Sequence, residues 1–159
     1  MSGSLHVLCG KIAAGKSTLS KRLAGETGGM VIAEDAWLST LYPGEIADLA
    51  DYRRSSERLR GAIAPLIVEM VKRGQAVILD FPANTVASRA WMKGLADAAG
   101  VTATLHFLDP PDEECRARMH ARNASGEHPY QVDDATFDQF TAHFVAPTDG
   151  EGFAIMHYG

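Results

Sequence analysis

The sequence predicts an α/β fold, in which a parallel sheet of about five strands carries helices on both faces and so forms three layers. Two observations predict it. Short apolar runs typical of buried strands alternate with segments whose apolar residues recur at helical spacing. A glycine-rich segment also joins the first apolar run to the first helical segment. The 159 residues have the length of one domain, so we expect a single domain over residues 1–159 that buries its own core.

The first half of the chain contains two strand–helix pairs. The expected elements are strands over 5–9 and 30–33 and helices over 16–24 and 45–73. Gly10 ends the first apolar run, and Gly25 stands where a helix C-cap glycine is common. Pro65 lies inside the long helical segment, where we expect it to kink or restart the helix, and Gly74 closes that segment.

The second half repeats the alternation. The expected elements are strands over 75–79, 101–108 and 153–158, helices over 85–99, 110–123 and 133–145, and a turn over 124–132. Thr85 or Asn84 can cap the first of these helices, and Gly100 can end it. Three acidic residues directly after Pro110-Pro111 favour a helix start there, because the first turn of a helix is positively polarised.

The composition excludes several classes of protein. Cys9 and Cys115 are too few and too far apart for a disulfide framework, and no Cys/His spacing suggests structural zinc. The longest apolar stretch, 62–70, is interrupted by Pro65 and Glu69, so we expect a cytoplasmic protein without a membrane segment. The net charge of −5 argues against general nucleic-acid binding, because nucleic-acid binders carry a basic field.

The glycine-rich segment matches the Walker A pattern G-x-x-x-x-G-K-[ST] and stands between an expected strand and an expected helix, as that pattern requires. Its glycines allow backbone N–H groups to turn toward phosphate oxygens. Lys16 would reach the β- and γ-phosphates, and the Ser17 hydroxyl would bind Mg²⁺. The expected nucleotide-binding residues are Gly10, Lys11, Ile12, Ala13, Ala14, Gly15, Lys16, Ser17 and Thr18. The alternative is a glycine-rich turn that binds no ligand.

Acidic residues follow two of the expected strands, at the edge where open α/β sheets bind ligands. Asp80 is our candidate for a second metal-side carboxylate, since Mg²⁺ keeps most of its waters and takes few protein ligands. Alternatively, Asp80 caps a turn or pairs with Arg89. Asp35 is our candidate for the base that positions an acceptor hydroxyl and takes its proton. Glu34 stays open as that base, and either residue can instead cap a short following helix.

Arginines are expected to neutralise the charge that develops on a transferred phosphoryl group. Arg118 and Arg122 are four residues apart and share one helix face, so both are catalytic candidates, whereas Arg116 points nearly opposite to Arg118. The alternative is that each arginine is solvated or pairs only with Glu113 or Glu114.

A second basic group lies between the second and third expected strands. Arg54 and Arg58 align on one helix face and could hold an acidic or phosphorylated acceptor, and Trp37 could stack on a ring or sugar. The alternative is an exposed helix in which these arginines pair with Asp51 and Glu57.

With these residues in place, the chain resembles the small P-loop kinases of the AAA_33-type predicted-ATPase group, related to polynucleotide 5′-hydroxyl kinases, zeta-toxin kinases and chloramphenicol phosphotransferase. The resemblance rests on the Walker A loop, residues 33–38, residues 77–84 with the trailing Arg89, and the arginines of 116–123. It implies a three-layer P-loop NTPase fold, an arginine-bearing helical lid at about 111–130, and ATP and Mg²⁺ as ligands. It makes Asn84 and Arg89 candidate substrate residues.

These observations lead to three hypotheses. The first is an ATP-dependent kinase that transfers the γ-phosphoryl group to a hydroxyl of a small-molecule acceptor. The second is a polynucleotide 5′-hydroxyl kinase, in which the basic residues 53–60 would contact the nucleic-acid backbone. The third is a nucleotide-binding regulatory ATPase without an acceptor. The sequence alone does not choose the acceptor, ATP over GTP, or the oligomeric state.

Overall fold

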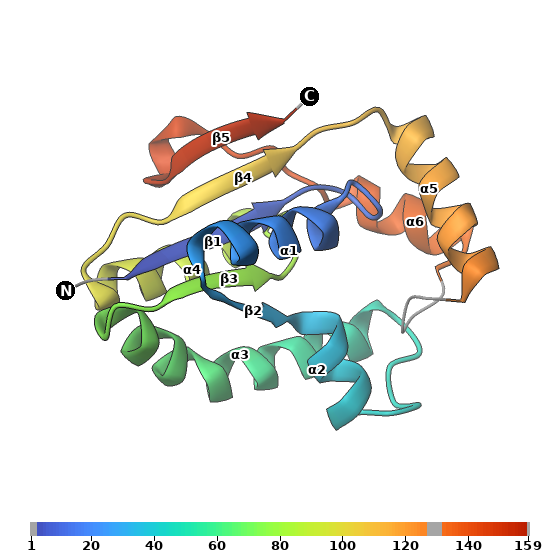
Figure 1. Cartoon of the computed structure of the whole chain (residues 1–159). Coiled ribbons are helices and arrows are strands. Elements are labelled where there is room, and N and C mark those ends of the chain that lie inside the picture. The colour runs from blue at the N-terminus through green and yellow to red at the C-terminus, as the bar shows by residue number, and fades with distance from the viewer. Residues whose placement is uncertain (1–2, 127–131, 159) are drawn as a thin grey trace.

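The structure is a computed structural model that describes residues 3–126 and 132–158. One sheet has the strand order β2-β3-β1-β4-β5, and every neighbouring pair is parallel (Figure 1). The strands are β1 (Ser4–Cys9), β2 (Met30–Ala33), β3 (Ala76–Asp80), β4 (Thr104–Leu108) and β5 (Ala154–Tyr158). The predicted α/β class with a five-stranded parallel sheet is therefore confirmed.

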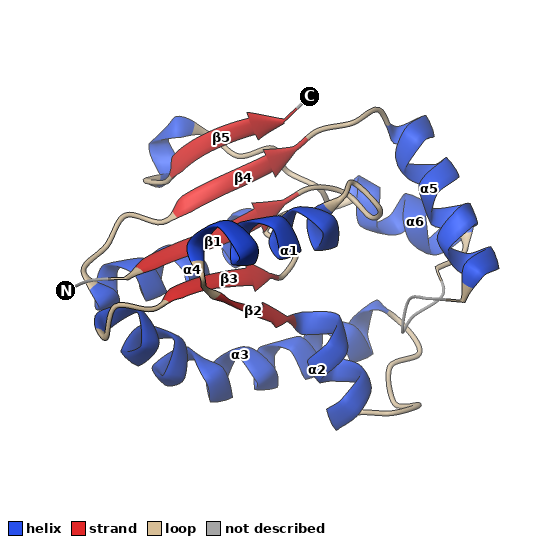
Figure 2. Cartoon of the chain, viewed as in Figure 1, coloured by secondary structure: helices blue, strands red, loops and turns tan. Residues whose placement is uncertain are grey.

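Helices cover both faces of the sheet (Figure 2). They are α1 (Lys16–Thr27), α2 (Glu34–Leu41), α3 (Leu49–Lys72), α4 (Val86–Ala99), α5 (Asp112–Ser125), α6 (Asp134–Ala142) and the 3-10 helix η1 (Asp149–Glu151). Successive residues of β1 point to opposite faces: Val7 packs in the cluster formed with α3 and α4, and Leu8 packs with α1. None of the helices in the described ranges is long and apolar enough to span a membrane.

Several helix boundaries differ from the prediction, and α6, for example, ends at Ala142 and not at 145. α1 passes through Gly25 and ends on Gly28, whose φ of 68° is left-handed. Any side chain at Gly25 would meet open space, so this glycine neither requires nor marks a helix end. The long helix starts after Asp48, whose carboxylate accepts the Asp51 N–H at 2.8 Å, because the cap outweighs the helical spacing that precedes it. Pro65 lies inside this helix, on its exposed side, and does not divide it.

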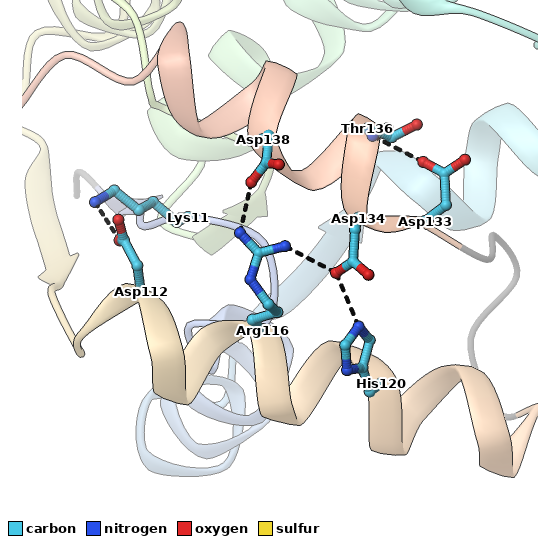
Figure 3. A network of polar contacts seen from close by, with 8 residues as sticks. All are labelled: Lys11, Asp112, Arg116, His120, Asp133, Asp134, Thr136 and Asp138. Carbon is cyan, nitrogen blue, oxygen red and sulfur yellow. Dashed lines mark hydrogen bonds and ion pairs between the residues drawn. The ribbon is translucent and has the colours of Figure 1, made fainter.

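Arg116 joins α5 to α6, as Figure 3 shows, and both helices lie beyond the carboxyl ends of the strands (Figure 1). Its guanidinium donates to Asp134 at 2.8 Å and to Asp138 at 2.5 Å, and it lies 4.6 Å from the centre of the Phe137 ring. The His120 Nε2 atom lies 2.9 Å from the same Asp134 oxygen. Arg116 therefore ties two helices together and does not point into the site described below.

The predicted lid at about 111–130 includes α5, which begins after Pro111 and reaches Ser125. The predicted turn over 124–132 begins later than expected, because Gly126 in a left-handed conformation ends the helix. The segment 127–131 of both predictions lies outside the described residues.

A chain of polar side chains crosses three strands on the α1 face. His6 Nδ1 lies 3.0 Å from His106 Nε2, and His106 Nδ1 lies 2.8 Å from the Tyr158 hydroxyl. The pKa of His106 is lowered to about 4, mainly by burial and to a smaller extent by the neighbouring His6 and Arg22. Burial also lowers the pKa of His6. His6 and His106 are therefore side chains packed against each other across neighbouring strands.

The buried His106 makes the stability of the folded state depend on pH. His106 stays neutral in the folded chain down to about pH 4, whereas the unfolded chain binds its proton near pH 6.5, so stability falls as pH drops from 6.5 toward 4. We expect a loss of up to about 3 kcal/mol from this residue. Urea denaturation at pH 7 and pH 4.5 measures it. His106→Gln should make the free energy of unfolding depend less on pH. His143→Gln changes a histidine at an exposed position and should keep the pH dependence of the unchanged protein. Equal pH dependence in both variants would contradict the assignment to His106.

Candidate active site

The loop between β1 and α1 has a backbone that only small residues permit. Gly15 has a φ of 107° and Ala13 a φ of 61°, and both values are left-handed. A Cβ at Gly10 would lie 3.0 Å from both the Ala14 Cβ and the Leu108 carbonyl oxygen. α1 begins directly after Gly15, which provides no side-chain cap, and its first turn has no acidic residue. The loop therefore presents a positively polarised helix start to an anion.

Asn84 holds this loop from the β3–α4 connection. The Gly10 N–H donates to Asn84 Oδ1 at 2.9 Å, and Asn84 Nδ2 donates to the Gly10 carbonyl oxygen at 2.7 Å. Both polar atoms of the Asn84 amide thus form hydrogen bonds with the backbone of Gly10. Asn84 was expected to act near the substrate; its side chain also lines the cavity, but its hydrogen bonds position the loop.

Lys16 and Ser17 begin α1 at the end of the loop. Lys16 Nζ donates to two carbonyl oxygens of the loop, at 2.7 and 2.9 Å. Burial lowers the pKa of Lys16, and the carboxylates of Asp80 and Asp35 oppose that shift. Ser17 Oγ donates to Asp80 Oδ2 at 3.0 Å. The structure therefore brings the predicted lysine, hydroxyl and metal-side carboxylate together.

A cavity of about 850 Å³ opens over the loop and extends to α6. One side, the α1 side, is lined by Thr18, Arg22, Leu108 and Tyr158. The other, the α6 side, is lined by Ile46, Leu49, Tyr52, Thr136, Gln139 and Phe140. Lys16, Ser17, Asp35 and Asp80 line the same cavity. A triphosphate on the loop and a second molecule beside Asp35 could therefore lie in one continuous cavity.

The structure separates the two carboxylates that follow β2. Asp35 lines the cavity. Glu34 is fully buried: it accepts hydrogen bonds from Tyr52 and, at 2.7 Å, from Ser56, and it lies 3.7 Å from Arg60. Burial raises the pKa of Glu34, and Arg60 opposes the shift. Glu34 therefore attaches α2 to α3, and Asp35 is the carboxylate that a ligand can reach.

Two arginines of α5 line the cavity. Arg118 donates to the Ala14 carbonyl oxygen at 3.3 Å and to Glu114 at 2.5 Å, so it contacts the loop and also forms the intrahelical pair that was the alternative. Arg122 is half-buried, and its Nε has no hydrogen-bond partner among the described residues. Burial lowers the pKa of Arg122, and Asp35 and Asp80 oppose the shift. Arg122 therefore brings a buried positive charge to these two carboxylates.

The comparisons with known proteins agree with this geometry. The family model AAA_33, described as an AAA domain, matches residues 5–147. This chain belongs to the AAA_33 family. The loop over 10–17 is accordingly the nucleotide-binding P-loop of an AAA_33 protein. A search of curated proteins found no match.

Solved structures share the fold of this AAA_33 protein at low identity. A Chloroflexus aurantiacus protein described as a candidate kinase has a TM-score of 0.79 and 21% identity, with 99% of this chain and 88% of that chain covered. Kti12 of Chaetomium thermophilum, bound to ADP-AlF3, has a TM-score of 0.74 and 16% identity, with 98% and 88% covered. A Sinorhizobium meliloti gluconokinase has a TM-score of 0.64 and 18% identity, with 99% and 83% covered. These likenesses show that the fold is that of small P-loop kinases.

Three predicted substrate residues of the AAA_33 protein, Trp37, Arg54 and Arg58, are not among the described residues that line the cavity. Trp37 and Arg58 lie exposed, and the exposed Arg54 donates to Asp51 at 2.7 Å. The alternative of a solvated helix with paired arginines therefore describes Arg54. The position of an arginine in the sequence does not determine which face of a long helix it occupies. The sequence alone therefore could not show whether Arg54 and Arg58 of α3 lie toward the cavity.

Arg89, which was predicted to lie near the substrate, is a buried residue that joins parts of the fold. Its side chain is 1% exposed. Its guanidinium donates to Glu151 at 2.8 Å and to the carbonyl oxygens of Ala83 at 2.9 Å and Val145 at 2.7 Å. These bonds join α4 to the segment that precedes β5, and Arg89 pairs with Glu151 and not with Asp80.

Sequence reasoning missed the residues that α6 contributes to the α6 side of the cavity. Tyr52, Thr136 and Phe140 line it, and the Phe140 ring packs edge-on against Tyr52 with ring centres 5.7 Å apart. Tyr52 stands among arginines in the sequence, and Phe140 lies in a helix without a motif. Their shared location follows only from how α6 folds back toward α3.

The oxygen atoms beside the P-loop fit Mg²⁺. Ser17 Oγ and Asp80 Oδ2 lie 3.0 Å apart, and hydroxyl and carboxylate oxygens are ligands that this ion accepts. Groups of three or more metal-binding side chains do not occur in the described parts of the chain. Mg²⁺ typically takes one or two protein ligands and draws the rest from water and phosphate, so Ser17 and Asp80 would suffice to hold it.

Proposed function

We propose that this AAA_33 protein is an ATP-dependent kinase that transfers the γ-phosphoryl group of ATP to a hydroxyl group of a small molecule. One observation carries the proposal: Asp35 lines the same cavity as Lys16 and Ser17 of the P-loop. A P-loop alone serves many nucleotide-binding proteins, whereas a carboxylate across the cavity from it gives a second substrate a place to react.

The residues divide the reaction between them. The P-loop backbone and Lys16 would bind the β- and γ-phosphates, and Ser17 with Asp80 would hold Mg²⁺. When bound, the ion neutralises phosphate charge and orients the oxygens. Asp35 would accept a hydrogen bond from the acceptor hydroxyl, whose oxygen forms the new bond to the γ-phosphorus as the bond to the β-phosphate oxygen breaks. The hydroxyl proton passes to the Asp35 carboxylate, and ADP carries away the electron pair of the broken bond.

Labelling tests the proposal directly. Purified protein is incubated with Mg²⁺, ATP labelled in the γ-phosphate and pools of small-molecule alcohols, and labelled products are separated from labelled phosphate. We expect label on at least one alcohol and ADP formed in equal amount. ATP binding with release of inorganic phosphate only would instead indicate an ATPase without acceptor. Transfer only to a 5′-hydroxyl oligonucleotide, with a steep dependence on salt, would indicate the nucleic-acid alternative.

Arg122 is expected to act mainly in the transition state. Its half-buried guanidinium faces Asp35 and Asp80, where it can stabilise charge on the moving phosphoryl group. Arg122→Ala should lower kcat by about 10²-fold and change the KM for ATP by less than about threefold. Arg118→Ala should also lower kcat, but less, because Arg118 already pairs with Glu114. Steady-state kinetics separates these effects, and a rise in KM with unchanged kcat would make Arg122 a ground-state binding residue.

A further inference from the structure

The α6 side of the cavity offers mainly apolar side chains to a second substrate. Ile46 comes from the connection before α3, Leu49 and Tyr52 come from α3, and Val132 and Phe140 come from the α6 region. These residues lie on segments far apart in the sequence and meet only at this wall. A substrate that binds here would remove this apolar surface from water, which stabilises the complex in proportion to the apolar area covered.

Two polar side chains of this wall, Tyr52 and Asp48, are engaged by the protein itself, whereas Thr136 and Gln139 add polar groups beside the apolar ones. The Tyr52 hydroxyl donates to the buried Glu34 carboxylate, so the tyrosine presents its ring to the cavity. The Asp48 carboxylate caps α3 by accepting the Asp51 N–H at 2.8 Å. Tyr52 therefore offers its ring as an apolar surface, and Asp48 serves as the N-cap of α3. Asp35 is the carboxylate of the cavity that we place next to an acceptor hydroxyl.

The cations that line the cavity stand on the phosphate-binding elements. Among the described residues they are Lys16 and Arg22 of α1 and Arg118 and Arg122 of α5. No arginine of α3 is among the described residues that line the cavity. Arg54 pairs with Asp51, and Arg60 lies over the Trp91 ring and donates to Ser88. An anionic group on the α6 side would thus face the carboxylates of Asp35 and Asp48, and it would compete with the phosphates for Arg122, the cavity-lining cation that interacts with Asp35. Removing such a group from water without a partner is costly.

We propose that the acceptor is an uncharged alcohol with an apolar group, such as an aryl ring or branched alkyl chain, next to the hydroxyl that reacts. This inference rests on the proposed kinase function and specifies its second substrate. The apolar group would lie against Leu49, Tyr52 and Phe140, and the hydroxyl would reach Asp35. Carboxylated or phosphorylated sugars and nucleic-acid strands are disfavoured for the same electrostatic reason.

Competition among acceptors of known charge tests the inference. The probes are 1-phenyl-1,2-ethanediol, gluconate and a 5′-hydroxyl dinucleotide, each with ATP labelled in the γ-phosphate and Mg²⁺. We expect kcat/KM for the aryl diol to exceed that of both anionic acceptors at least tenfold. A preference for gluconate or the dinucleotide would overturn the inference while leaving the kinase function intact. Binding of ATP without labelling of any probe or of any alcohol pool would overturn both.

A matched pair of leucine variants locates the apolar contact. Leu49→Ala removes part of the wall and should lower kcat/KM for the aryl diol about tenfold, with the KM for ATP unchanged. Leu41→Ala makes the same chemical change at an exposed position of α2 and should leave both constants within twofold. Thermal melting of each variant identifies any loss of folding. Equal effects of the two substitutions on a folded protein would overturn the placement of the acceptor.

Discussion

Asp35→Asn is expected to lower the rate of phosphoryl transfer by about 10²–10⁴-fold. The amide keeps the size of the carboxylate and can still contact an acceptor hydroxyl, but it cannot take the proton as the new bond forms. ATP binding should change little, because the P-loop and Lys16 provide the phosphate contacts. Single-turnover transfer of labelled phosphate measures the rate, and calorimetric titration with ATP and Mg²⁺ measures the binding.

Asp149→Asn is the matched control for this prediction. Asp149 also carries a carboxylate, so the chemical change is the same, but Asp149 lies exposed in η1. We expect this variant to transfer phosphate at the normal rate. If Asp35→Asn kept its full rate of ATP turnover, the protein would be an ATPase that needs no acceptor base, and the kinase proposal would be wrong.

Lys16→Ala is expected to abolish measurable transfer, with a loss of about 10³-fold or more, since a buried cation at the γ-phosphate stabilises charge where water is excluded. The variant also removes two hydrogen bonds to loop carbonyl oxygens. The folded state should survive, because the lysine stands at the cavity and outside the apolar clusters. Transfer assays and thermal melting measure the two effects separately.

Lys21→Ala provides the comparison on the same helix. Lys21 is exposed on α1, so its loss removes a positive charge without changing the P-loop. We expect normal transfer and a normal melting temperature. A large drop in the melting temperature of Lys16→Ala, with Lys21→Ala unaffected, would show that Lys16 acts as a structural residue of the loop.

The fold could be predicted from the sequence because its signals are local. Short apolar runs such as 76–79 favour a buried strand in any α/β fold. Glycines such as Gly100 end helices because they adopt a left-handed backbone conformation. The boundaries that failed depend on competition between signals. Gly25 can end a helix, but Gly28 does so here, and only the left-handed backbone at the second position distinguishes them.

The phosphate-binding part of the site could also be predicted, because one short segment contains it. The P-loop, Asp80 and Asp35 follow strands whose carboxyl ends must meet at one edge of a parallel sheet. The remaining cavity lining comes from side chains whose orientation depends on packing. Sequence position could not show that Arg89 turns inward to Glu151, or that Phe140 of α6 meets Tyr52 of α3.

The double hydrogen bond between Asn84 and Gly10 has a consequence for affinity. It holds the first residue of the P-loop before any nucleotide arrives, so the loop loses this part of its conformational entropy during folding and not during binding. Nucleotide association then needs little rearrangement of the backbone, and rapid exchange of ADP for ATP becomes compatible with tight binding. The affinity of the proposed kinase for its nucleotide would accordingly depend in part on the Asn84 amide.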